Sequence, residues 1–399
     1  MYDVKFGDCF SLEEDGSYFV VDCGSKNSDS YMTRETFPFS KIQPLLKFNP
    51  ALLITHFDYD HYSGILAMSD NNGCVTKNKY KSCLKEIYLP YCFWLDGNVI
   101  TGYKESIDQT GLIHTMIYLT LLTRFKKLIN LSRLFASIPS LVLNHKNVHC
   151  VEAGETIDFK GHPFNVLWPS QNAVQMLSTD RIANVNKVLR EKLKKQIGTQ
   201  ETKIERNYEE TIESFAASLQ EIYKYYAAIE KNSDTFNGVL GRFNEAFTKF
   251  INLSESITKI AVKGSPAILK GEESVIDGMN ACSIIFDEKS EGNRIGKVLF
   301  LGDATPKVIH QIDNKFANSY VVIKVQHHAT NPYFCCLHKA KYNLISNNGY
   351  PNWPISNRQV QQIQGNGGSI LYTSSHNYGC INGKCNSSNC NPSSFTINV

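Results

Sequence analysis

Side chains suited to metal binding are concentrated in the stretch "THFDYDH" at residues 55–61, which contains His56, Asp58, Asp60 and His61. Imidazole and carboxylate groups are common ligands of Zn, Mn and Fe. One loop rarely supplies a complete ligand set, so a metal site needs partners elsewhere in the chain. Asp303 in "LGDA" and the pair His327 and His328 in "VQHHAT" have the chemistry to be those partners. The alternative is a set of polar loops that hold no metal.

Metal ions held by these residues would favour hydrolysis of a phosphodiester. Two divalent cations about 3.5–4 Å apart lower the pKa of a bridging water and stabilise both oxygens of an in-line displacement at phosphorus. No dinucleotide motif competes for this role, and "GNGG" at 365–368 lacks the strand-to-helix context of a phosphate-binding loop. The hydroxyls of Thr330 and Ser346 are candidates to bind a substrate phosphate, although capping of turns or helices is the more common role of such residues.

Each ligand cluster follows an apolar run that is typical of a β-strand. "ALLI" precedes His56, "VLFL" precedes Asp303, and "YVVIKV" precedes His327. Loops at strand ends, held in place by a rigid sheet, are a common location for catalytic groups. Strand-like runs dominate residues 1–100 and return from residue 263 onward. We therefore expect a mixed α/β fold with the site at the ends of its strands.

Residues 178–262 differ from the rest of the chain, because they combine many Lys, Glu, Gln and Ala residues with few turn-forming residues. A heptad-like seam runs through Ile212, Phe215, Leu219, Ile222, Tyr226 and Ile229. The seam predicts a helical hairpin or coiled-coil arm, which could bind a protein partner or a second copy of the chain. The alternative is a set of helices packed flat on the main domain.

Charge in this helical region changes sign along the sequence. Residues 181–206 carry eight Lys and Arg against three Glu, a net charge of +5, whereas residues 207–230 carry one Lys against five Glu, a net charge of −4. Pairing between antiparallel helices explains this pattern, and so does a basic edge at 187–195 that binds nucleic acid. The formal net charge of the whole chain, +3, is too small to indicate nucleic-acid binding by itself.

The segment "HFDYDH" resembles the HxHxDH signature of the metallo-β-lactamase fold. Further blocks follow the order found in the hydrolase domain of competence DNA-uptake proteins: "GDCFSL", "VVDCG", "VLWPS", "NACSII", "LFLGDAT", "HHAT", "LISNNGYPNWP" and "ILYTSS". Together the blocks span residues 7–375. This resemblance implies an αββα sandwich formed by residues 1–177 and 263–399, interrupted by the helical insertion at 178–262.

The resemblance also implies roles for individual residues. It assigns His56 and Asp58 to one metal ion, Asp60 and His61 to a second, Asp303 to a bridge between them, and either His327 or His328 to the second site. Asp60 and Asp303 are the expected catalytic residues, with Asp60 orienting the attacking hydroxide. Asn280, in the "NACSII" block, is an expected substrate-binding residue.

One departure from the signature affects the choice of metal. Asp58 stands where the signature has histidine, and a carboxylate there favours Mn over Zn. We expect one or two divalent ions, Zn or Mn, and hydrolysis of nucleic acid. The alternatives are hydrolysis of a small ester, amide or cyclic nucleotide, and a degenerate site in a regulatory or binding subunit that uses the helical insertion.

The end of the chain contains a second group of soft ligands, His376, Cys380, Cys385 and Cys390. Their spacing is wider than in the usual zinc knuckles, so a structural zinc ion, disulfide pairing and free thiols all remain open. The longest apolar stretch, residues 112–122, is about half the length that a membrane span requires. With no secretory signal and cysteines mostly in apolar segments, we expect a cytoplasmic protein without membrane contact.

Overall fold

The computed structural model describes residues 1–26, 32–69, 80–96, 111–170, 173, 179–198, 208–259, 265–288, 295–330, 338–347 and 354–372. Five strands form the first sheet in the order of the sequence: β1 (Cys9–Glu14), β2 (Ser17–Cys23), β3 (Ala51–Leu53), β4 (Ile87–Pro90) and β5 (Val148–Val151). β1 and β2 are antiparallel, and β2 to β5 are parallel to their neighbours. The start of β1 therefore lies at the same sheet edge as the ends of β2 and β3.

The second sheet contains seven strands in the order β12-β11-β10-β9-β8-β7-β6. Its members are β6 (Thr156–Phe159), β7 (His162–Trp168), β8 (Ile285–Glu288), β9 (Ile295–Phe300), β10 (Ser319–Lys324), β11 (Lys339–Ile345) and β12 (Ser369–Tyr372). Strands β9 to β12 are parallel, whereas β6 to β9 alternate in direction. The ends of β9 and β10 thus lie at one edge, where the loops with Asp303 and His327 begin.

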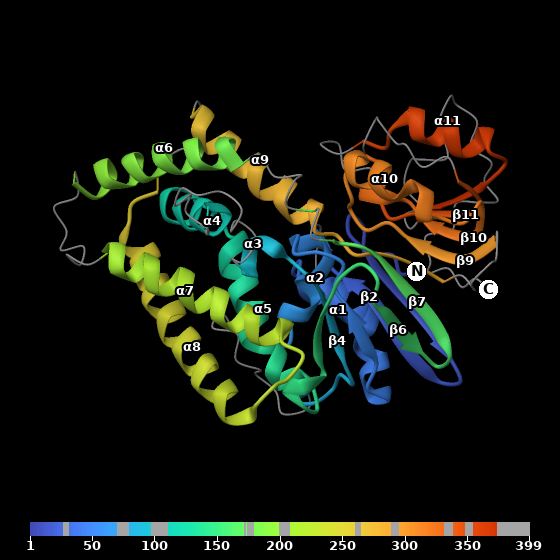
Figure 1. Ribbon diagram of the computed structural model, residues 1–399, viewed down its shortest axis with the longest axis horizontal. Coiled ribbons are helices and arrows are strands. Elements are labelled where there is room, and N and C mark those ends of the chain that lie inside the picture. Colours follow the sequence, from blue (N-terminus) through green and yellow to red (C-terminus); the bar gives the residue numbers. More distant parts are fainter. Residues whose placement is uncertain are drawn as a thin grey trace.

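The two sheets pack face to face, because alternate residues of their strands share one hydrophobic cluster. Phe19 and Val21 of β2 meet Phe164 of β7, Phe286 of β8 and Phe300 of β9 in this cluster. Helices cover the outer faces (Figure 1): α1 (Thr36–Ile42), α2 (Tyr59–Leu66) and α5 (Lys127–Leu141) on the first sheet, α10 (Pro306–Ile312) and α11 (Asn357–Gly365) on the second. The expected mixed α and β class is confirmed.

A group of helices extends the layer on the first sheet: α3 (Phe93–Asp96), α4 (Gly111–Leu122), α6 (Thr179–Gly198), α7 (Tyr208–Ala227), α8 (Ser233–Ser256) and α9 (Pro266–Ala281). α7 and α8 form the predicted hairpin, in which the rings of Phe215 and Phe250 stack with centroids 4.3 Å apart. The seam is buried from Ile212 to Tyr226, but Ile229 lies beyond the end of α7 and is exposed.

The hairpin of α7 and α8 packs on the main body of the protein. This agrees with the alternative in which the helices pack flat on the main domain. The Tyr223 hydroxyl donates a hydrogen bond to the Pro90 carbonyl (2.8 Å) and accepts one from the Cys92 amide (2.5 Å). The Tyr226 hydroxyl donates to the Phe135 carbonyl (2.7 Å). Both side chains belong to the same hydrophobic cluster as the outer face of the first sheet. The boundaries of a separate insertion domain at 178–262 stay a prediction.

The polarised charges of this region pair between helices at several positions. Arg190 and Lys194 of α6 lie 3.2 Å and 3.3 Å from the Glu209 carboxylate of α7, and Arg181 pairs with Glu273 of α9. Pairing of helices therefore explains part of the charge pattern. Among the helices in the described ranges, none is both long and apolar enough to cross a membrane.

Candidate metal centre

The ends of three strands bring the sequence-predicted residues together. After β3 the chain passes through His56 and Asp58 into α2, so that Asp60 and His61 lie in the first turn of that helix. Asp303 follows β9. His327 and His328 follow β10 in the short 3-10 segment Gln326–Ala329. These loops meet at one edge of the two sheets, as the pattern of apolar runs predicted.

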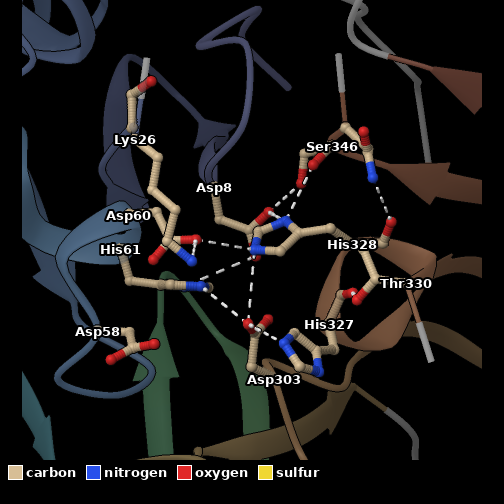
Figure 2. Close-up of polar contacts among 12 residues, drawn as sticks. Asp8, Lys26, Asp58, Asp60, His61, Asp303, His327, His328, Thr330 and Ser346 are labelled. Atoms are coloured by element: carbon tan, nitrogen blue, oxygen red, sulfur yellow. Dashed lines mark hydrogen bonds and ion pairs between the residues drawn. The ribbon is translucent and has the colours of Figure 1, made fainter. Parts of the chain in front are cut away.

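Four buried side chains form the centre of the site: Asp8, His61, Asp303 and His328. One ligand atom from each lies within 4.8 Å of all the others, a grouping that could hold a metal ion. The Nε2 atoms of His61 and His328 lie 3.5 Å and 3.4 Å from Oδ2 of Asp303. Figure 2 shows these side chains pointing toward one another from separate loops.

Both central imidazoles are oriented by a second polar group. Nδ1 of His61 lies 2.8 Å from Oδ2 of Asp22, and Nδ1 of His328 donates to the Ser346 carbonyl at 2.9 Å. Asp22 is itself fixed, because the amide and hydroxyl of Thr55 both donate to its carboxylate at 2.7 Å. Histidines that bind metals commonly donate their other N–H to such a carboxylate or carbonyl. Each Nε2 atom is thereby directed into the centre.

The spacing of the central atoms fits a metal ion. Nε2 of His61 and Nε2 of His328 are buried and have no hydrogen-bond partner among the described residues. Ligand atoms bound at about 2.0–2.2 Å to a tetrahedral ion lie roughly 3.3–3.6 Å from one another. The nitrogen–oxygen separations of 3.5 Å and 3.4 Å to Asp303 match that range. His61, Asp303 and His328 therefore fit a divalent cation bound between them, and Asp8 offers a fourth ligand atom within 4.8 Å of theirs.

Two glycines allow the loops to approach this closely. A Cβ atom on Gly24 would lie 2.2 Å from the Asp60 carbonyl carbon, and one on Gly7 would lie 2.3 Å from the Gly24 carbonyl oxygen. Through this contact the Asp8 amide donates to the Asp60 carbonyl at 3.0 Å. The first sheet thus places Asp8 beside the turn that carries Asp60 and His61.

The histidine pair has an unusual backbone. His327, His328 and Ala329 have φ angles of 46°, 52° and 60°, in the left-handed region that side chains other than glycine rarely adopt. Such conformations cost on the order of 1–3 kcal/mol each and are concentrated at functional sites. The turn directs His328 into the centre, whereas His327 remains at its rim with 27% of its side chain exposed.

Three lysines neutralise the carboxylates of the site. Lys324, which is 1% exposed, contacts Asp8 and lies 3.6 Å from Asp303. Burial alone would lower the pKa of Lys324, but these two carboxylates raise it above its ordinary value. Lys26 lies 3.0 Å from Oδ2 of Asp60, and Lys127 contacts Asp58. Lys324 and Lys26, whose pKa values the neighbouring carboxylates raise, therefore remain charged.

The histidines differ in their protonation. Burial lowers the pKa of His56 to about 3, so that it is neutral. Burial also opposes the charged form of His61, but Asp303 and Asp22 outweigh that effect and raise its pKa to about 10. The pKa of His328 is raised in the same way by Asp303 and Asp8. Without a metal ion, the carboxylates thus hold protons on the two central imidazoles.

The remaining predicted ligands lie around the four central side chains. Nε2 of His56 lies 4.0 Å from Oδ2 of Asp303, and Oδ2 of Asp60 lies 3.2 Å from Nε2 of His328. Asp58 lies to the side in Figure 2, with no dashed line to the other labelled residues. Of the two candidate histidines, His328 belongs to the centre.

The predicted substrate-binding residues have structural contacts. The Thr330 hydroxyl donates to the His327 carbonyl at 2.8 Å, which closes the turn, and the Ser346 hydroxyl donates to Asp8. Asn280 is buried at the end of α9. The sequence prediction that these residues bind substrate is not tested by these contacts. The candidate group His376, Cys380, Cys385 and Cys390 lies outside the described residues.

Sequence reasoning missed Asp8 and the lysines. Asp8 follows Gly7 just as Asp303 follows Gly302, so the repeated Gly-Asp pair was a usable signal. Lys324 interrupts the apolar strand "YVVIKV", where a buried cation requires a buried anion. Lys127 offered no comparable signal, because its partner Asp58 lies 69 residues earlier.

No family model, curated protein or solved structure matches the chain.

Proposed function

We propose that this protein is a divalent-metal-dependent hydrolase with its metal centre at Asp8, His61, Asp303 and His328. The observation that carries the proposal is the convergence of these four buried side chains, with ligand atoms within 4.8 Å of one another. The orientation of both imidazoles by Asp22 and by the Ser346 carbonyl supports it.

The fold supports assignment to the metallo-β-lactamase type. Two sheets face each other, helices cover their outer faces, and the histidine and aspartate loops meet at one edge. This is the arrangement that the resemblance of "HFDYDH" and the later blocks implies. The assignment remains our proposal, and it predicts that the chemistry is hydrolytic.

The chain's own residues have distinct roles in the proposed reaction. A divalent cation, when bound, would supply a Lewis acid that polarises a phosphoryl oxygen and lowers the pKa of water. Lys324 holds the carboxylates of Asp8 and Asp303 in place. Asp60 lies beside the centre, 3.2 Å from His328, where its carboxylate can accept a hydrogen bond from the attacking water and orient it. His56 is neutral and can accept a hydrogen bond at Nε2.

An anionic substrate fits the outer side of the site. Lys26 keeps 31% of its side chain exposed while it pairs with Asp60, and His327 is exposed at the rim. The Lys26 ammonium and the His327 imidazole can therefore contact a phosphate while the four central residues hold the metal ion. We propose the phosphodiester of a nucleic acid as the substrate class. A cyclic nucleotide or another small phosphate ester shares this chemistry and is the nearest alternative.

A second candidate function has one specific observation in its favour. Asp58, expected to bind metal, is engaged by Lys127, and Asp60 is engaged by Lys26. A site neutralised by lysines in this way is compatible with a regulatory or binding subunit that has lost its activity. Metal analysis separates the two candidates, because the proposed hydrolase must bind a divalent ion.

The test combines metal loading with a substrate screen. Purified protein is supplied separately with Mn²⁺ and Zn²⁺ and assayed on single-stranded DNA, duplex DNA, RNA and cyclic nucleotides. Cleavage that is lost in Asp303→Asn supports the proposed function, with His310→Gln on α10 as a matched control outside the centre. Metal binding with cleavage of only the cyclic nucleotides would replace the substrate class. Failure to bind either metal would refute the proposed function.

A further inference from the structure

The predicted ligands divide into two groups with different surroundings. The four central residues face one another, with the imidazole Nε2 atoms directed inward. His56, Asp58 and Asp60, which the resemblance also assigns as metal ligands, lie around this centre and have other partners nearby. Two of these three, Asp58 and Asp60, are each in contact with an ammonium group. Lys324 also contacts Asp8 in the centre, but there two imidazoles and Asp303 remain available to a metal ion. In the second group the lysines engage both carboxylates and leave only His56.

Lys127 lies at the start of α5 and reaches the loop before α2. Its ammonium contacts Oδ1 of Asp58, and 20% of its side chain is exposed. Asp58 stands at the N-terminus of α2, but its side chain makes no capping hydrogen bond to the helix. The carboxylate is therefore committed to Lys127 rather than to the backbone of its own helix. With Asp58 engaged, His56 and the bridging position of Asp303 are too few ligands for a second ion.

The charges of the site also indicate that it holds one divalent ion rather than two. Five buried carboxylates meet in it: Asp8, Asp22, Asp58, Asp60 and Asp303. Three ammonium groups, those of Lys26, Lys127 and Lys324, oppose them. Once a metal ion has displaced the protons from His61 and His328, two negative charges remain, and that one divalent cation balances them. A second divalent cation would leave two positive charges in a buried site, and uncompensated buried charge is strongly unfavourable.

We infer that the site holds a single divalent cation and that the Lys127 ammonium, bound to Asp58, takes the place of the second one. This inference rests on the proposed function, because it specifies the form of that metal centre. Lys26 adds a second fixed positive charge on the same side through Asp60. Asp58, which stands where the signature has histidine, is then explained by its pairing with Lys127, 69 residues later in the chain.

The test is a count of metal ions per chain. The full chain is equilibrated with Mn²⁺ or, separately, Zn²⁺, desalted, and analysed by mass spectrometry of the metal against protein concentration. We expect one ion per chain in the wild type and in Lys127→Arg, which keeps the positive charge. We expect two in Lys127→Met, because the Asp58 carboxylate, which interacts electrostatically with His56, is then free to bind a second ion. Lys126→Met, an exposed neighbour on the same turn, is the matched control and should keep one.

The possible results separate the two proposals. Two ions in the wild type would overturn the single-ion inference and leave the proposed hydrolase intact. No bound ion in the wild type would refute the proposed function itself. One ion in both the wild type and a folded Lys127→Met variant, as judged by circular dichroism, would remove Lys127 from the place of the second cation. If Lys127→Met does not fold, the wild-type count alone still decides between one ion and two.

Discussion

Lys324 provides the sharpest test of the electrostatics of the site, because it is the most deeply buried of the three lysines. Its ammonium contacts Asp8, lies 3.6 Å from Asp303, and donates to the Gly302 carbonyl at 3.2 Å. In Lys324→Met the aliphatic stem is retained while the positive charge is removed. Two buried carboxylates then face each other across the centre without this cation.

The size of the expected loss in unfolding free energy follows from the burial of the Lys324 ammonium. Removal of one partner from a buried ion pair costs about 3–5 kcal/mol, because the other charge stays buried without compensation. Lys324 is 1% exposed, so solvent provides little screening. We expect the free energy of unfolding of the metal-free protein to fall by an amount near the lower end of that range, because the protonated imidazoles of His61 and His328 still face Asp303 and Asp8. Lys339→Met, an exposed position on the neighbouring strand β11, should change it by less than about 0.5 kcal/mol.

Urea unfolding of protein dialysed against a chelator measures this difference. A divalent ion should restore more stability to Lys324→Met than to the wild type, because it supplies the missing positive charge beside Asp8 and Asp303. A metal-free Lys324→Met protein that is as stable as the wild type would refute this electrostatic account. So would an added ion that stabilises both proteins equally.

Three further predictions follow from the same contacts. Because carboxylates raise the pKa of His61 to about 10 and also raise that of His328, both imidazoles must lose a proton to bind metal. The affinity for the metal ion should therefore rise between pH 6 and 9, with release of close to two protons for each ion bound. Calorimetry in buffers of different ionisation enthalpy should detect this release. Metal binding without proton release would contradict the assignment of His61 and His328 as ligands. Gly24→Ala, whose Cβ would lie 2.2 Å from the Asp60 carbonyl carbon, should weaken metal binding by about 10–100-fold, while Gly241→Ala, with open space around it, should not. Tyr223→Phe should lower the free energy of unfolding by about 1–3 kcal/mol for each of the two backbone groups that lose their partner, measured in urea against Tyr225→Phe. An unchanged unfolding midpoint in Tyr223→Phe would show that these two hydrogen bonds contribute little to stability.

The sequence was informative where chemistry and periodicity act locally. Apolar runs followed by histidine or aspartate predicted strands that end at a common site, and the loops with His61, Asp303 and His328 do converge. The spacing of Phe215 and its neighbours predicted a helical seam, which is buried between α7 and α8. A seam shows that a helix buries one face, but it does not identify the surface on which the helix packs. The hydrogen bonds of Tyr223 to Pro90 at the end of β4 and to Cys92 just after it therefore could not be predicted.

Long-range pairing accounts for most of what the sequence left open. Asp8 precedes the first strand and joins the site because β1 runs antiparallel to β2, a pairing that places its start beside the end of β3. Asp58 was expected to bind metal from its place in the local stretch "THFDYDH" and in the signature. Its contact with Lys127 depends on how α5 packs near the start of α2, and no local pattern encodes that geometry.

The central claim is that one divalent ion binds among Asp8, His61, Asp303 and His328. Anomalous diffraction from crystals of the manganese-loaded protein, collected at the manganese absorption edge, tests it most directly. The account predicts one anomalous peak within bonding distance of the Nε2 atoms of His61 and His328 and of the Asp303 carboxylate, and no second peak at Asp58. A loaded crystal without a peak in this centre, or with its peak elsewhere in the protein, would contradict the account.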